Sequence, residues 1–274
     1  MHKLLLAFGL LTVSFFATAK EHRSSLRALV VYNDEPSNLQ GFYDFDAQQV
    51  RKTCEGIAYH TKMRLRLKVC KESEFSQNLY AHWLQSIPSK GDDIAFFYYS
   101  GRSPQTSGAS NHWPSLKLNK NGPEPVQHIA KDQIAQDIKQ RHTRLGLVFF
   151  DCYEKVVSVP KQHFSIIKPL SKTGPRSNFK RLFVKAKGMV AACSTERNGD
   201  AYGIEQGRPC GGLFTRAFVI SIQTVSPKTF QWKMVAYDLR ALCKVPRYVN
   251  QTPHMSIDVS APPTHYFPFT PRQK

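Results

Sequence analysis

The chain has 274 residues, of which 41% are hydrophobic, and it carries a formal net charge of +18. The apolar content is enough for a real hydrophobic core, and the length fits one large domain or two small ones. After the first 19 residues no stretch reaches the roughly 18 apolar residues of a transmembrane helix, which excludes a helical membrane protein. The positive charge favours an anionic partner, although it is equally consistent with a role in solubility alone.

The amino-terminal residues have the pattern of a secretory signal peptide. Lys3 precedes an almost unbroken apolar run at 4–16, and Ala17-Thr18-Ala19 supplies the small residues of a cleavage site. We therefore expect cleavage near Ala19, which leaves residues 20–274 as a single soluble domain that is secreted or periplasmic. A buried amino-terminal strand and a retained anchor are the alternatives. An exported protein rarely meets nucleic acid, so a protein, peptide or anionic surface is the expected partner.

Six cysteines are spread over the chain, and an even number in an exported protein permits disulfides. The sequence does not decide among the possible pairings. Cys193 and Cys210 flank one loop and are the best candidates for a bond. No CxxC pair occurs, which argues against a structural zinc site, and we expect neither a metal nor a cofactor.

The hydrophobic pattern predicts an alternation of strands and helices. Continuous apolar runs predict buried strands at 27–32, 94–99, 145–150 and 188–193. An alternating pattern predicts strands with an exposed face or at the sheet edge at 63–69 and 252–259. Helical spacing occurs at 46–59, 73–87, 129–143, 212–224 and 228–242. Residues 101–125 are rich in Ser, Pro and Gly and are expected to form a loop, as are those between Cys193 and Cys210.

This order indicates an α/β fold, with a mainly parallel sheet of about six strands and helices on both faces. In such sheets the functional residues lie in loops at the carboxyl ends of the strands. The segments after Tyr99, Phe150 and Cys193 are therefore the places where a site is expected.

Five short motifs occur at these strand ends and at the starts of the elements that follow. They are FFYYSGR at 96–102, FFDCYE at 149–154, AACST at 191–195 with GDA at 199–201, GGLFT at 211–215 and QTP at 251–253. In this order and spacing they resemble the caspase and metacaspase family of cysteine peptidases. The resemblance implies a caspase-like sandwich over nearly all of the mature chain, and a substrate pocket shaped by Asp151, Ser194 and Asp200.

The two positions that the family uses for catalysis hold other residues. The catalytic His of the family follows Ser-Gly, where this chain has Arg102, and the catalytic Cys stands two residues after Asp151, where it has Tyr153. Arginine stays protonated and cannot act as a general base. A phenol is a poor substitute for a thiolate nucleophile.

Cys152, one residue before the nucleophile position, leaves an active enzyme open as an alternative. If the strand continues, the Cys152 side chain points to the opposite face from Tyr153, but a bulge could absorb one residue. A structural or disulfide-bonded cysteine is the simpler interpretation. An enzyme that used Cys152 would need a base, and His112 in the loop after Arg102 is a candidate by proximity.

The segment Lys155–Lys187 has nine Lys or Arg residues and no acidic residue. It lies where the family has a linker loop that active relatives cut during maturation. Without a catalytic dyad, it is either a solvated loop or an anion-binding arm. The sequence thus favours an inactive pseudopeptidase that binds a peptide or an anionic partner, with a cysteine endopeptidase using Cys152 as the alternative.

Overall fold

Six strands pair into one sheet in the order β11-β8-β6-β3-β1-β2. The strands are β1 (Ser25–Tyr32), β2 (Arg64–Lys71), β3 (Gly91–Gly101), β6 (Thr143–Cys152), β8 (Lys187–Cys193) and β11 (His254–Ser260). All neighbours are parallel except β11, which pairs antiparallel with β8. The prediction of a mainly parallel, six-stranded sheet is confirmed.

The computed structural model describes residues 24–89, 91–103, 114–119, 127–158, 179–195, 199–206, 209–224, 231–244 and 251–260. The expected signal peptide, His112 and residues 159–178 of the basic segment lie outside these ranges. No helix within them is long and apolar enough to cross a membrane.

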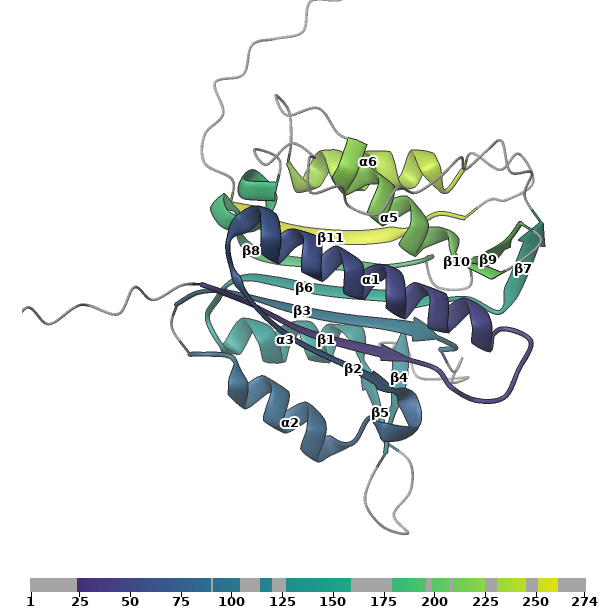
Figure 1. Ribbon diagram of the computed structural model, residues 1–274, viewed down its shortest axis with the longest axis horizontal. Coiled ribbons are helices and arrows are strands. Elements are labelled where there is room, and N and C mark those ends of the chain that lie inside the picture. The colour runs from purple at the N-terminus through teal and green to yellow at the C-terminus, as the bar shows by residue number, and fades with distance from the viewer. Residues whose placement is uncertain are drawn as a thin grey trace, which may run out of the picture.

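Helices cover both faces of the sheet, as Figure 1 shows. On one face lie α1 (Gln40–Thr61), α5 (Leu213–Thr224), α6 (Trp232–Leu242) and the π-helical segment Lys180–Lys185. On the other face lie α2 (Gln77–Ser86) and α3 (Lys131–Gln140). Because β3 and β6 are covered on both sides, they must be apolar throughout, which explains their continuous runs.

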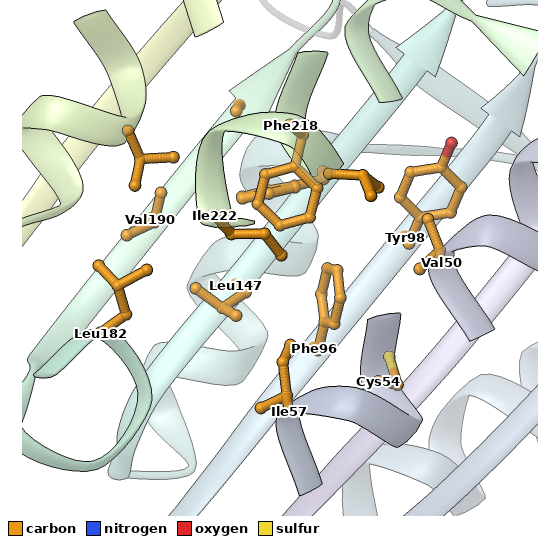
Figure 2. Packing of buried hydrophobic residues seen from close by; sticks show 14 of the residues in the cluster. Val50, Cys54, Ile57, Phe96, Tyr98, Leu147, Leu182, Val190, Phe218 and Ile222 are labelled. Carbon is orange, nitrogen blue, oxygen red and sulfur yellow. The ribbon is translucent and has the colours of Figure 1, made fainter. Parts of the chain in front are cut away.

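The larger core lies between the sheet and α1, α5 and α6. Figure 2 shows Ile57 of α1 and Phe218 of α5 on either side of Phe96 and Leu147 of the central strands, and all four belong to one core cluster. Phe149 packs edge to face on Phe218, with ring centroids 4.7 Å apart. This packing holds α1 and α5 on the central strands.

Two smaller sheets occur where loops were expected. β4 (Ser115–Leu118) pairs with β5 (Gln127–Ala130), and β9 (Tyr202–Glu205) pairs with both β7 (Lys155–Ser158) and β10 (Pro209–Gly212). The expectation that 155–187 is one loop was wrong at its ends, which form β7 and the π-helical segment. These strands of four residues are too short for a hydrophobic period to reveal them.

Candidate functional site at the strand ends

Three neighbouring strands end together at one edge of the central sheet. Gly101 at the end of β3 lies opposite Cys152 of β6, and Phe150 of β6 lies opposite Cys193 of β8. The small β7–β9–β10 sheet lies beyond these ends (Figure 1). The three segments that the sequence singled out are therefore neighbours in space.

Tyr153 is anchored at both of its ends. The side chain is buried, and its phenol donates to Asp46 Oδ2 at 2.9 Å. Its backbone N–H donates to the Gly101 carbonyl at 3.2 Å. Tyr43 of α1 packs on the ring, with centroids 5.0 Å apart, and donates its hydroxyl to the Tyr153 carbonyl at 2.9 Å. Tyr153 is thus held in place by α1 rather than presented to solvent.

Arg102 reaches the same tyrosine of α1 from the neighbouring strand. Its side chain is exposed, and its guanidinium charge lies close enough to the Tyr43 hydroxyl to lower the pKa of that group. Burial raises the pKa of Tyr43, and the Arg102 contact offsets this only in part. The Arg102 carbonyl accepts the Tyr99 hydroxyl at 2.8 Å. Arg102 and Tyr153 thus both lie near Tyr43, which packs on the Tyr153 ring and is affected by the Arg102 charge.

Two carboxyl groups, Asp46 and Asp151, are fully buried below these residues. Asp46 accepts Ser100 Oγ at 2.7 Å and the Gly212 N–H at 2.8 Å. Asp151 Oδ2 accepts the N–H and hydroxyl of Thr215 at 2.9 and 2.6 Å. Burial raises the pKa of Asp46 well above its ordinary value, and the Asp151 charge raises it further. Burial also raises the pKa of Asp151, to about 7, so the pair holds a proton at neutral pH.

The Gly-Gly pair before α5 allows the backbone to approach these carboxyls. A Cβ atom on Gly212 would lie 2.1 Å from Asp151 Oδ2, and one on Gly211 would lie 2.1 Å from Asp46 Oδ1. Gly211 also has a φ of +80°, which disfavours other residues. The glycines of the GGLFT motif are thus required by the close contact with the acid pair.

Cys152 continues the alternation of β6 and packs on the opposite side from Asp151. It joins the apolar cluster of Phe150 and Cys193 and is 6% exposed. The Cys152 N–H donates to Ser194 Oγ at 3.0 Å, and the Ser194 hydroxyl donates to the Cys152 carbonyl at 2.8 Å. Burial raises the pKa of the Cys152 thiol well above its ordinary value, and the Asp151 charge adds to the shift. A cysteine nucleophile reacts as the thiolate, and this environment keeps Cys152 neutral.

A cavity of about 270 Å³ opens over the strand ends. On its rim Lys155 Nζ donates to Asp200 Oδ1 at 2.6 Å, and the Tyr202 hydroxyl donates to Asp200 Oδ2 at 3.1 Å. These two hydrogen bonds lower the pKa of Asp200. Other parts of the wall come from Ser103, Cys152, Tyr153 and Glu154. The cavity thus presents both acidic and basic groups, and none of the described residues that line it is a histidine.

The predicted pocket residues divide into two groups. Asp200 lines the cavity, whereas Asp151 and Ser194 are fully buried and hold the strand ends from below. The proposed base His112 lies outside the described residues. The described part of the chain contains no group of three His, Cys, Asp or Glu residues that could hold a metal ion.

The expected Cys193–Cys210 disulfide is not formed. Cys193 belongs to the cluster under α2 and α3, and its thiol donates to the Thr195 carbonyl at 3.0 Å. Cys210 belongs to the cluster under α1 and α5, on the other side of the sheet. All six cysteines lie in the described part of the chain, where all are buried and none is disulfide-bonded. Proximity in the sequence was misleading because the two side chains belong to clusters on opposite faces of the central sheet.

The sequence did not single out Asp46 or Tyr43, although both support the site. Asp46 falls on the same helical stripe as Val50, Cys54 and Ile57, all of which are buried. An acidic residue on the apolar stripe of a helix needs a buried hydrogen-bonding partner. That pattern could have identified Asp46 as part of a buried polar site.

No family model and no curated protein matches the sequence. Among solved structures, the crystal structure of caspase-1 from Spodoptera frugiperda matches with a TM-score of 0.50 and 10% identity, covering 86% of this chain and 87% of that chain. The structure of pro-sf-caspase-1 matches with a TM-score of 0.49 and 11% identity over 86% of this chain and 88% of that chain. The fold is caspase-like. The caspase-like sandwich expected from the five motifs is thereby confirmed as a fold.

Proposed function

We propose that this protein is an exported, catalytically inactive protein of caspase-like fold that binds a peptide or an anionic partner at the strand-end cavity. The observation that carries the proposal is the anchoring of Tyr153. Its phenol donates to Asp46 and its carbonyl accepts from Tyr43, which makes it a buried structural side chain. This supports the proposal because the sequence motifs align Tyr153 with the nucleophile of the caspase family. The motifs align the exposed Arg102 with the general base of the family, and a guanidinium stays protonated and cannot take up a proton.

The cavity supports a binding role because it is open and has charged walls. Lys155 and Asp200 are each about half exposed at its rim, where a ligand can compete for their hydrogen bonds. The end of β6, the start of β7 and the loops after β3 and β8 supply the lining. A small number of polar groups around a concave surface is typical of ligand sites.

The alternative function is a cysteine endopeptidase that uses Cys152 with a displaced base such as His112. One observation favours it, which is that Cys152 contributes to the cavity wall. The raised pKa of the thiol and its apolar surroundings argue against it, because a peptidase of this type needs a thiolate.

Hydrolysis of fluorogenic peptides that end in Arg or Lys separates these two functions. The mature protein is assayed with and without a reducing thiol and calcium, beside Cys152→Ala and a Cys54→Ala control in the α1 core. We expect no turnover from any of the three proteins. Turnover that Cys152→Ala abolishes and Cys54→Ala retains would overturn the proposal. Activity gained by an Arg102→His, Tyr153→Cys double variant would support it.

Binding is tested with a displayed peptide library selected on the mature protein. The dissociation constant of the best peptide is then measured by fluorescence anisotropy. Gly199 lies on the exposed rim of the cavity, so Gly199→Trp should weaken binding at least tenfold. Lys233→Trp on the exposed face of α6 is the control and should leave it unchanged. Equal affinity for both variants would exclude the cavity as the binding site.

Sequencing the amino terminus of the secreted product tests export and cleavage near Ala19.

A further inference from the structure

The strand β2 forms the edge of the central sheet farthest from β11, as Figure 1 shows. Its inner side pairs with β1 along all eight residues. Among the described residues no strand pairs with its outer side. Every second backbone N–H and C=O group of such a strand points outward and can bond to another chain.

The two faces of β2 differ sharply in character. Arg64, Arg66 and Lys68 are exposed on the face toward α2. They repeat every second residue, which places them about 7 Å apart along the strand. None of the three forms an ion pair with another residue in the part of the chain that the structure describes. The row therefore offers three uncompensated positive charges at the spacing of a β-strand.

The opposite face of β2 is apolar and borders a groove. Leu65, Leu67 and Val69 pack on the α1 side of the core but remain partly exposed. They line a groove of about 540 Å³ together with Arg51 and Glu55 of α1, and Lys68 also contributes to its rim. Arg51 and Glu55 pair with each other at 3.1 Å, so the helix adds little net charge to the groove.

We propose that the β2 edge binds an extended segment of a partner protein in which acidic and apolar residues alternate. Such a segment adds a seventh strand through backbone hydrogen bonds. Its acidic side chains then face Arg64, Arg66 and Lys68, and its apolar side chains enter the groove beside Leu67. An acidic polysaccharide matches only the row of cations, whereas an alternating peptide uses the cations, the backbone edge and the groove.

The same charges determine which chains the edge accepts. Basic residues on an edge strand keep identical copies of a protein from pairing, because like charges then lie opposite each other. An acidic segment reverses the sign of that interaction. The β2 edge is therefore selective for acidic strands, and it lies apart from the strand-end cavity.

A fluorescein-labelled peptide of alternating Glu and Val residues is the probe. Its control is a peptide of the same composition with the Glu and Val residues in two blocks. Anisotropy is measured at about 0.15 M salt, where long-range attraction is largely screened. We expect the alternating peptide to bind at least tenfold more tightly and to slow amide hydrogen exchange in Arg64–Lys71.

Charge reversal identifies the surface. The triple variant Arg64→Glu, Arg66→Glu, Lys68→Glu should lower the affinity at least tenfold. The control variant Lys187→Glu, Lys233→Glu, Lys244→Glu makes the same change in charge at three exposed positions. Lys187 lies in β8, Lys233 in α6 and Lys244 just after α6, and this variant should bind the alternating peptide with unchanged affinity. Circular dichroism and a thermal melt establish that both variants are folded. Equal binding of the two peptides, an equal loss in both variants, or slowed exchange outside β2 would overturn the proposal. Gly199→Trp should leave this binding unchanged, so the test is independent of the cavity.

Discussion

Replacing Asp151 by asparagine removes one of the two buried carboxyls and keeps the shape of the side chain. The N–H and hydroxyl of Thr215 donate to Asp151 Oδ2 at 2.9 and 2.6 Å and can donate equally to an amide oxygen. The other oxygen, Oδ1, has no hydrogen-bond partner among the described residues. Asp151→Asn therefore removes a titrating group without removing an existing hydrogen bond.

The expected effect on stability follows from the pKa of Asp151, which burial raises from 3.8 to about 7. In the unfolded chain the carboxyl loses its proton near pH 4, and in the folded protein near pH 7. The stability that this group contributes is therefore fully present below about pH 4 and is lost as the pH rises through 7. At about 1.4 kcal/mol per pH unit, a shift of three units corresponds to roughly 4 kcal/mol.

Urea unfolding at pH 5, 6, 7 and 8, followed by far-ultraviolet circular dichroism, measures this effect. We expect the free energy of unfolding of Asp151→Asn, relative to wild type, to rise by about 2–3 kcal/mol between pH 5 and pH 8, because about two of the three units lie in this window. Asp258→Asn, at a carboxyl with 77% of its side chain exposed, should follow the wild type across the series. Parallel pH curves for wild type and Asp151→Asn would refute the assignment of a proton to the buried pair.

Tyr153→Phe leaves the buried Asp46 without one of its donors and should cost about 1–3 kcal/mol in urea unfolding. Tyr202→Phe removes a hydroxyl bonded to an exposed carboxylate and should change the unfolding free energy by less than about 0.5 kcal/mol; equal costs would contradict the anchoring role. Iodoacetamide should label Cys152 at least about 100-fold more slowly in the native protein than in urea, as read by peptide mass spectrometry; fast native labelling below pH 8 would indicate a thiolate. Phe149→Ala should cost about 3–5 kcal/mol in thermal or urea unfolding, and a loss below 1 kcal/mol would show that the core closes around it.

The central sheet was predictable because its strands carry a strong local signal. β3 and β6 are buried on both faces, so nearly every residue in them must be apolar, and each run stops where a polar residue begins the site. The four-residue strands around the cavity carry no such signal. Their positions depend on contacts with one another and with α1, which no local pattern records.

The direction of the Cys152 side chain was the feature that the sequence left open. A strand that continues past Asp151 and a bulge at that point have the same sequence. The ladder between β3 and β6 continues through the Gly101–Cys152 pair without a bulge, and this places the thiol on the α2–α3 side. Pairing between β3 and β6 determines the direction of the Cys152 side chain, so this direction could not be predicted from the sequence of β6 alone.

The contacts that complete the acid pair have a consequence for the order in which the protein folds. Asp46 receives the phenol of Tyr153 from 107 residues away and the N–H of Gly212 from 166 residues away. Contacts between such distant parts of a chain form late, because large loops must close first. A nascent chain that has not reached β10 still lacks one of the donors that this carboxyl needs. The strand-end site is therefore completed only after most of the protein has been synthesised, so its assembly reports a chain that extends at least through Gly212.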